Sequence, residues 1–327
     1  MVYANTKYKR QKGSHSMIVS VTMNPSVDIS YKLDDFKLND VNRVSNVMKT
    51  AGGKGLNVAR VIHLLHSPVI ATGMLGGTIG SFIENQLDQD GIDHNFLKTD
   101  QESRNCIAIL HEGNQTEILE AGPQFSRNEG DDFLNHYQQL LEKAEVVTIS
   151  GSLPKGLDAS IYCEMIRLAE TKQIPVILDC SGGVLKDVLQ FQEARPFAIK
   201  PNIDELNQLL DTKITSEDQL KNALEHPLFA RIQWLVISMG AQGAFVKHNQ
   251  EHFLVKIPKI NVVNPVGSGD SVVAGMAVSI LQKKSREELM KTAMTAGVLN
   301  TMESQTGYVN SEKFEQIFNE IEICRVD

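Results

Sequence analysis

The segment Gly267-Ser268-Gly269-Asp270 combines a turn suited to bind an anion with a side chain that could accept a proton. It runs directly into apolar residues at helical spacing, so the turn is expected to open a helix. Free backbone N–H groups and the helix dipole at such an end attract a phosphoryl group. Asp270 could take a proton from an attacking hydroxyl. The alternative is that Asp270 only caps the helix, because Asp is favoured at this position.

A second glycine-rich turn, Gly52-Gly53-Lys54-Gly55, precedes another stretch of helical spacing. Lys54 and Asn57 could donate hydrogen bonds to an anion there. The alternative is a tight turn whose glycines let the helix pack closely on a sheet. The spacing fits neither a Walker A loop nor the G-x-G-x-x-G dinucleotide fingerprint, so both of those nucleotide-binding folds are disfavoured.

Two weaker features lie between these turns. Ser238, Gly240 and Gly243 follow an apolar strand and could line a nucleotide groove, or could form a hairpin turn. Asn202 and Glu205 share one face at the start of a helix and could hold hydrated Mg²⁺, or could simply cap that helix.

From residue 128 to the end, apolar strand patterns alternate with helical ones, which predicts βαβ units and a parallel sheet. We expect one domain over residues 17–327. Two stretches of alternating polarity, roughly 24–46 and 103–121, predict a small antiparallel lid. Glu112-Gly113-Asn114 is a hairpin signal within the second stretch.

The chain has 327 residues and a net charge of −8. Residues 1–16 carry four basic and no acidic residues and include Gly-Ser-His-Ser, so they are interpreted as a cloning remnant; without them the net charge is −12. This acidity disfavours a nucleic-acid partner, and no apolar run reaches the length of a membrane span. The four cysteines match no metal motif, and the composition favours a reduced, cytoplasmic protein.

Several of these segments together match a known pattern. N-P-V-G-S-G-D-S-V-V-A-G-M-A, from Asn264, resembles the C-terminal signature of the ribokinase-like (PfkB) sugar kinases. A-G-G-K-G-L-N-V-A, from Ala51, is similar to their N-terminal signature, and K-P-N-x-x-E and S-M-G-x-x-G follow in the family's order. The resemblance covers nearly everything from Met17. It implies a three-layer α/β/α fold with a mainly parallel central sheet, a small β lid and ATP-dependent phosphorylation of a sugar.

The resemblance also implies a role for each motif. Asp270 would be the catalytic base, beside an anion hole made by Gly267, Ser268 and Gly269. Asn202 and Glu205 would hold Mg²⁺ through water. ATP would be bordered by Ser238, Gly240 and Gly243, with Ala296 and Asn300 near the adenine. The sugar hydroxyls would be held by Asp28, Gly52, Gly53 and Asn57.

Within the family, V-T-M-N-P-S-V-D from Val21 resembles the phosphosugar kinases, and further segments look closest to tagatose-6-phosphate kinases of lactose catabolism. The implied reaction is transfer from MgATP to the C1 hydroxyl of D-tagatose 6-phosphate. Alternatives are a 1-phosphofructokinase, a 6-phosphofructokinase, or a non-catalytic sugar-phosphate sensor. Arg43, Lys54 and Arg104 are cations that could bind the sugar phosphate, although a solvated surface position is the ordinary fate of such residues. The resemblance also implies a homodimer formed through the lid.

Overall fold

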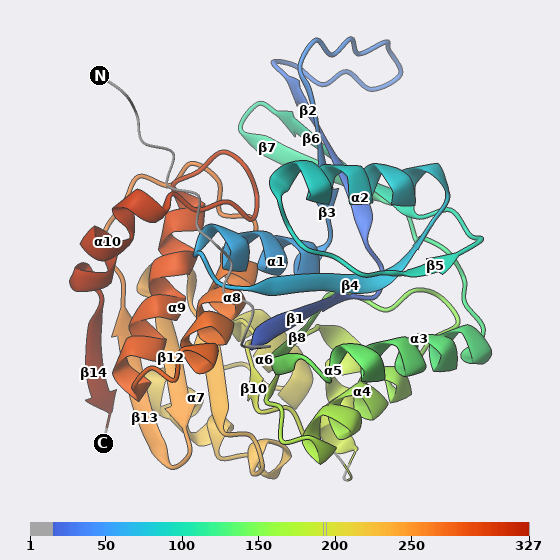
Figure 1. The fold of residues 1–327 in the computed structure, drawn as a ribbon. Coiled ribbons are helices and arrows are strands. Elements are labelled where there is room, and N and C mark those ends of the chain that lie inside the picture. Colours follow the sequence, from blue (N-terminus) through green and yellow to red (C-terminus); the bar gives the residue numbers. More distant parts are fainter. Residues whose placement is uncertain (1–15, 192, 194, 327) are drawn as a thin grey trace, which may run out of the picture.

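A ten-stranded sheet runs through the middle of the molecule, in the order β14-β13-β12-β11-β10-β9-β8-β1-β4-β5 (Figure 1). The structure is a computed structural model that describes residues 16–191, 193 and 195–326, so the predicted cloning remnant lies outside the described residues except for Ser16. The strands from β5 to β11 are parallel, and β12, β13 and β14 continue the sheet by antiparallel pairing. The strands are β1 Met17–Thr22, β4 Val69–Gly76, β5 Leu97–Thr99, β8 Ala144–Ser150, β9 Val176–Asp179, β10 Ala198–Ile199, β11 Trp234–Ser238, β12 Ala244–His248, β13 Glu251–Lys256 and β14 Glu322–Val326.

Both faces of this sheet are covered by helices, which explains why its central strands are continuous apolar runs. In β1, Ile18 belongs to one hydrophobic core and Val19 to the other. The core around Ile18 is completed by α1 Lys54–Leu64, α2 Gly77–Asp90, α8 Ser268–Leu281, α9 Arg286–Thr301 and α10 Phe314–Glu320. The core around Val19 is completed by α3 Arg127–Leu140, α4 Ser160–Thr171, α5 Gly182–Gln190, α6 Ile203–Leu210 and α7 Glu217–Leu224. The three-layer α/β/α fold is therefore confirmed.

A second, four-stranded sheet stands beside the main one and forms the lid (Figure 1). Its order is β3-β2-β6-β7, with β2 Ser26–Leu33, β3 Val47–Gly52, β6 Arg104–His111 and β7 Asn114–Leu119. The hairpin at Glu112-Gly113 is confirmed, and both turn residues have positive φ, as a two-residue hairpin turn requires.

Two expectations about the lid were wrong. The lid is not wholly antiparallel, because β2 and β6 pair in parallel. The chain passes through β4, α2 and β5 of the main body between these two strands, and such a crossover returns in the same direction. The first lid segment also runs beyond residue 46 through β3 to Gly52. The last residues of β3 belong to the glycine turn, so the sequence pattern did not indicate a strand there.

Two further sequence expectations concern membranes and cysteines. Within the described ranges, no helix combines the length and the apolar character needed to cross a membrane. All four cysteines fall in those ranges, and each is a free thiol.

Helices α8 and α9 pack so closely that their contact requires a glycine. A Cβ atom on Gly275 of α8 would lie 2.7 Å from the Cα atom of Ala293 and 2.8 Å from the carbonyl oxygen of Thr292, both backbone atoms of α9. Backbone cannot rotate away as a side chain can, so the distance between these helices is fixed here. Helix α8 also packs against α1 on its other side, and the position of Asp270 follows from both contacts.

Gly275→Ala should therefore destabilise the fold even though alanine is the better helix former. The added methyl group must push α8 from α9, and we expect the free energy of unfolding to fall by about 1–3 kcal/mol, measured by urea denaturation. The matched control is Gly183→Ala in α5, where no described atom lies within 4 Å of the new Cβ. That variant should keep or raise stability by up to about 1 kcal/mol. Equal effects of the two substitutions would contradict the packing argument.

Candidate active site

The candidate site lies at the carboxyl edge of the parallel strands, where ligands bind in open α/β sheets. Asp179 is the last residue of β9, and Lys200 follows the neighbouring β10. Strand pairing brings them together, with Lys200 Nζ 3.6 Å from Asp179 Oδ1. Lys54 approaches from α1, with its Nζ 3.8 Å from Asp179 Oδ2. One buried carboxylate thus holds two ammonium groups.

Helices α1 and α8 both begin at this site, and both have a glycine N-cap. Gly53 and Gly267 adopt φ values of 104° and 82°, in the left-handed region that favours glycine, and neither can supply a capping side chain. By contrast α3, α6, α7 and α9 are capped by the side chains of Ser126, Asn202, Ser216 and Ser285. The N–H groups in the first turns of α1 and α8 therefore have no capping side chain from the N-cap residue, an arrangement that can bind an anion.

Asp270 lies in the first turn of α8 and is hydrogen-bonded to Asn57 of α1. Asn57 Nδ2 donates to Asp270 Oδ2 over 2.9 Å, and both side chains are buried. Burial, and second the negative charge of Asp179, raise the pKa of Asp270 to about 7. The Asn57 hydrogen bond, Lys54 and Lys200 act in the opposite direction. A carboxyl with a pKa near neutrality is suited to accept a proton and release it again.

The two lysines flank this carboxyl. The attraction of Asp179 is the main cause that raises the pKa of Lys54, and burial opposes it. A Cβ atom on Gly269 would lie 2.9 Å from Lys200 Nζ, so this ammonium group lies against the first turn of α8. Lys54, Lys200 and the two helix N-termini together make a positive region in an acidic protein.

The base of the lid contributes Asp28 from β2. A Cβ atom on Gly52 would fall 2.0 Å from Asp28 Cγ, so the carboxyl group occupies the space that any other residue there would need. Ser26 Oγ donates to Asp28 Oδ1 over 2.7 Å. Burial raises the pKa of Asp28, against the opposing effects of the Ser26 hydrogen bond and of Arg60 and Arg104. Asp28 can accept hydrogen bonds from hydroxyl groups beside the α1 N-terminus.

The segment after β10 forms a helix cap. Glu205 N donates to Asn202 Oδ1 over 2.8 Å, and Asn202 N donates to Glu205 Oε2 over 2.9 Å, a capping box at the start of α6. The capping alternative is therefore confirmed for this pair. The charge of Glu205 still reaches the site, because it helps to raise the pKa of Lys54. In the part of the chain that the structure describes, no group of three or more His, Cys, Asp and Glu side chains is arranged to hold a metal ion.

The Ser238 segment lies next to this cap. Ser238 N donates to Pro201 O over 3.1 Å, and Ser238 and Asn202 form an isolated parallel β-bridge. Gly240 and Gly243 make the turn between the antiparallel strands β11 and β12, so the hairpin alternative is confirmed as the local structure. The turn thereby follows a strand that ends at the same sheet edge as Asp179.

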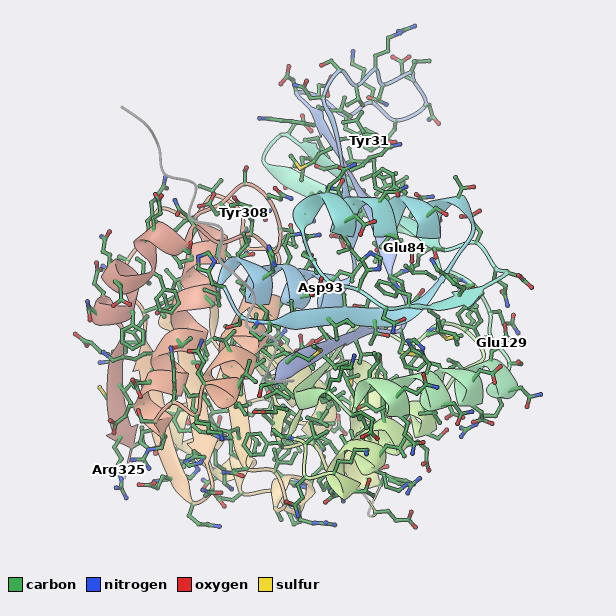
Figure 2. All side chains as sticks on the ribbon, viewed as in Figure 1. Tyr31, Glu84, Asp93, Glu129, Tyr308 and Arg325 are labelled. Carbon is green, nitrogen blue, oxygen red and sulfur yellow. The ribbon has the colours of Figure 1, made fainter. Side chains whose placement is uncertain are left out.

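Ala296 and Asn300 lie on α9 and are fully buried. Asn300 Nδ2 donates to Val266 O over 2.8 Å, and Gly307 N donates to Asn300 Oδ1 over 2.9 Å. Asn300 therefore fixes the loop that leads into α8 and the loop that follows α9. Figure 2 labels Tyr308 in this second loop and Tyr31 on lid strand β2. The two residues lie on the same side of the molecule.

The two arginines of the predicted phosphate site lie in different surroundings. Arg104, the first residue of β6, donates from Nε and Nη2 to Asn24 O and from Nη1 to Glu120 O, at 3.3, 3.2 and 2.8 Å. Its guanidinium ties the lid to the loop after β1. Arg43 is exposed in the loop between β2 and β3. This loop lies at the outer end of the lid, away from the main sheet (Figure 1).

The structure thus brings Asp270, Asn57, Lys54 and the glycine turns together as expected from the sequence. It also places Asp179 and Arg60 at the site, although sequence reasoning gave neither a role. Asp179 is the residue that pairs with Lys200. For Asp179 a usable signal existed, because V-I-L-D ends an apolar strand in a carboxylate.

Comparison with known proteins gives consistent results. The family model described as pfkB family carbohydrate kinase matches residues 21–313. A crystal structure of a "putative phosphofructokinase" from Staphylococcus aureus is 29% identical, covers 95% of this chain and 99% of that chain, and has a TM-score of 0.81. A "possible 1-phosphofructokinase" from Thermotoga maritima is 26% identical, with coverage of 95% and 100% and a TM-score of 0.83. Phosphofructokinase-2 from Escherichia coli, 24% identical over 93% and 98%, shares the fold with a TM-score of 0.86.

Asp270→Asn tests the burial of this carboxyl through stability. The folded pKa of about 7 lies above the ordinary 3.8, so wild-type stability should fall as pH rises from about 4 to about 7 and then stay level. The Asn variant has no carboxyl to ionise at this position, so it does not lose stability in this way. Its free energy of unfolding should exceed that of wild type by an amount that grows over this window to about 4 kcal/mol.

Urea denaturation at pH 5 and pH 8 measures this difference. The matched control, Asp187→Asn, removes an exposed carboxyl on α5 and should not reproduce the pH-dependent gain. A gain for Asp270→Asn of equal size at both pH values would contradict the burial argument.

Proposed function

The chain belongs to the pfkB family of carbohydrate kinases, and we propose that it transfers a phosphoryl group from ATP to the C1 hydroxyl of D-tagatose 6-phosphate, giving D-tagatose 1,6-bisphosphate. The observation that carries the kinase reaction is the buried carboxyl of Asp270, held by Asn57 between two helix N-termini that lack side-chain caps. A proton acceptor and an anion site coincide at this point. Phosphoryl transfer needs both, and otherwise depends on positioning and charge.

In this proposal Asp270 accepts the proton of the attacking hydroxyl. The amides of Gly267, Ser268 and Gly269 and the ammonium group of Lys200 stabilise negative charge on the transferred phosphoryl group. Asp179 keeps Lys54 and Lys200 beside the proposed position of the phosphoryl group. Because these groups are fixed by strand and helix ends, they need little rearrangement when the charge develops.

Asn202 and Glu205 are the residues proposed to hold Mg²⁺ through water. Their donor set fits a hydrated ion, since both side chains supply oxygen and Mg²⁺ keeps several waters in such sites. Asp179 Oδ2, which is buried without a hydrogen-bond partner, adds a further hard oxygen nearby. When bound, the ion would neutralise phosphate charge.

The ATP site is proposed to run from this cap along the β11–β12 turn, past Ser238, Gly240 and Gly243. Gly240 offers open space for a ligand, since no described atom lies within 4 Å of where its Cβ would be. Ala296 and Asn300 are buried, so their proposed contribution near the adenine is to shape the site from behind, through the loops that Asn300 holds.

The sugar is proposed to lie between the lid and α1, with its hydroxyl groups held by Asp28, Gly52, Gly53 and Asn57. Lys54 and Arg104 are the proposed cations for its phosphate group. Arg43 could take part only if the lid loop folds over the substrate, because that loop lies at the outer end of the lid, away from the main sheet.

The choice of tagatose 6-phosphate is supported by the sequence segments from Val21 onward, which resemble that group of kinases. The second candidate is a fructose phosphate, which the names of the similar solved structures favour. An ADP-release assay over tagatose 6-phosphate, fructose 6-phosphate and fructose 1-phosphate should give the highest kcat/KM for tagatose 6-phosphate, by about tenfold or more. A higher value for either fructose phosphate would select the second candidate.

Asp270→Asn is the control for chemistry in the same assay. Loss of the proton acceptor should lower kcat by about 100-fold or more, while ATP binding measured by calorimetry stays largely unchanged. A near-wild-type kcat would contradict the assignment. Specific binding of a phosphosugar by wild type without ADP release would instead support a sugar-phosphate sensor.

A homodimer through the lid is also proposed. Val47 and Met48 on β3 and Ile118 and Leu119 on β7 are exposed apolar residues on one small sheet, and the Escherichia coli neighbour has a tetrameric inhibited form. Burial of these side chains would favour association. Sedimentation velocity should show a dimer that Met48→Asp dissociates, and a wild-type monomer at micromolar concentration would contradict the proposal.

A further inference from the structure

Arg60 is a buried arginine on α1, one turn after Asn57. Its Nη1 donates to Asn57 Oδ1 over 3.1 Å, and its Nη2 donates to the carbonyl oxygen of Ala51 at the end of β3. Its Nε lies 3.7 Å from Asp90 Oδ2, at the end of α2. Asp28 is the other carboxylate whose charge acts on it. Arg60 therefore connects α1, α2 and the base of the lid.

These contacts decide which way the Asn57 amide points. A guanidinium only donates hydrogen bonds, so the group it faces must be the amide oxygen. That leaves the amide nitrogen of Asn57 to face Asp270, as observed. A flipped amide would place N–H groups against the guanidinium and oxygen against the carboxylate, and it would lose both bonds.

The loop after α9 closes the remaining side of Asn57. A Cβ atom on Gly307 would lie 2.9 Å from both Cβ and Oδ1 of Asn57, so the amide has little room to move away. A hydrogen bond to its ionised form stabilises a carboxylate. The Asn57 amide therefore favours ionised Asp270 only in the orientation that Arg60 imposes.

A purely structural role would not require a charge here. Burying a guanidinium is costly unless it is paired, and an apolar side chain could fill the same space on α1. The groups that face Arg60 are Asp28 and Asp90, and those that face Asp270 are Asp179, Lys54 and Lys200. The link between the two sets is the Asn57 side chain.

We propose that Arg60 is a positioning residue for phosphoryl transfer: by holding Asn57 Oδ1 it aims Asn57 Nδ2 at Asp270 and fixes the carboxylate that accepts the proton. This inference rests on the proposed kinase function. The same guanidinium holds Ala51, which adjoins the Gly52 against which Asp28 packs, so one side chain aligns the sugar-binding edge of the lid with the proton acceptor.

The test is Arg60→Lys, which keeps the positive charge but loses the fork of donors. The titration of Asp270 is followed by NMR of protein labelled with ¹³C at the Asp carboxyl groups, and the signal is assigned by its loss in Asp270→Asn. Without a fixed amide donor, the titration midpoint should rise by about 0.5–1 pH unit. The acidic limb of the kcat/KM profile should move with it, and the KM for ATP should stay unchanged.

Asn57→Ala provides the matched control. It should raise the midpoint by a similar amount, and adding Arg60→Lys to it should produce no further shift. Asp90→Asn is a milder variant that removes the Nε partner, and it should shift the midpoint in the same direction by less. If Arg60→Lys does not fold, Asp90→Asn and Asn57→Ala decide the question.

An unchanged midpoint in folded Arg60→Lys would overturn the proposal; if that variant does not fold, an unchanged midpoint in Asp90→Asn would do so. A shift of equal size with and without Asn57 would also overturn it, because the effect would then bypass the amide. The NMR titration needs no activity, so the positioning role of Arg60 and the proposed kinase function can fail separately. A shifted midpoint without ADP release on any phosphosugar would retain the positioning and reject the kinase function.

Discussion

The hydrogen bond between Asn57 and Asp270 is the interaction on which the site depends. It joins the first turn of α1 to the first turn of α8 across 213 residues of sequence. It can form only if both helices begin at the same point of the sheet edge and pack side by side. The glycine N-caps allow the first condition, and the close contact of α8 with α9 at Gly275 constrains the second.

Asp179 gives this arrangement its electrostatic balance. It attracts Lys54 and Lys200, which would otherwise repel each other and leave the site. Its charge also raises the pKa of Asp270, while the two lysines lower it. One carboxylate thus gathers two cations and helps to raise the pKa of the neighbouring carboxyl. In a chain with a net charge of −8, this single residue holds two cations at the candidate site.

Much of this could be predicted from the sequence, and the limit has a physical origin. The alternation of strands and helices after residue 128, the hairpin at Glu112-Gly113 and the helices after both glycine turns follow local rules of periodicity and turn geometry. Asp270 and Asn57 were expected to share a site. The pairing of Lys200 with Asp179 could not be read locally, because it depends on which strands are neighbours in the sheet. Arg60 escaped notice because a basic residue among apolar ones looks like an ordinary exposed position of a helix.

The surroundings of Arg104 differ from those that the sequence suggested. The sequence suggested a cation that could bind the sugar phosphate, whereas three of the five guanidinium N–H groups already donate to the carbonyl oxygens of Asn24 and Glu120. These bonds, which hold the lid to the loop after β1, use three of the five guanidinium N–H groups and leave one on Nη1 and one on Nη2 for a phosphate group. A phosphate group bound at Arg104 would therefore be held by the same side chain that ties the lid to the loop after β1.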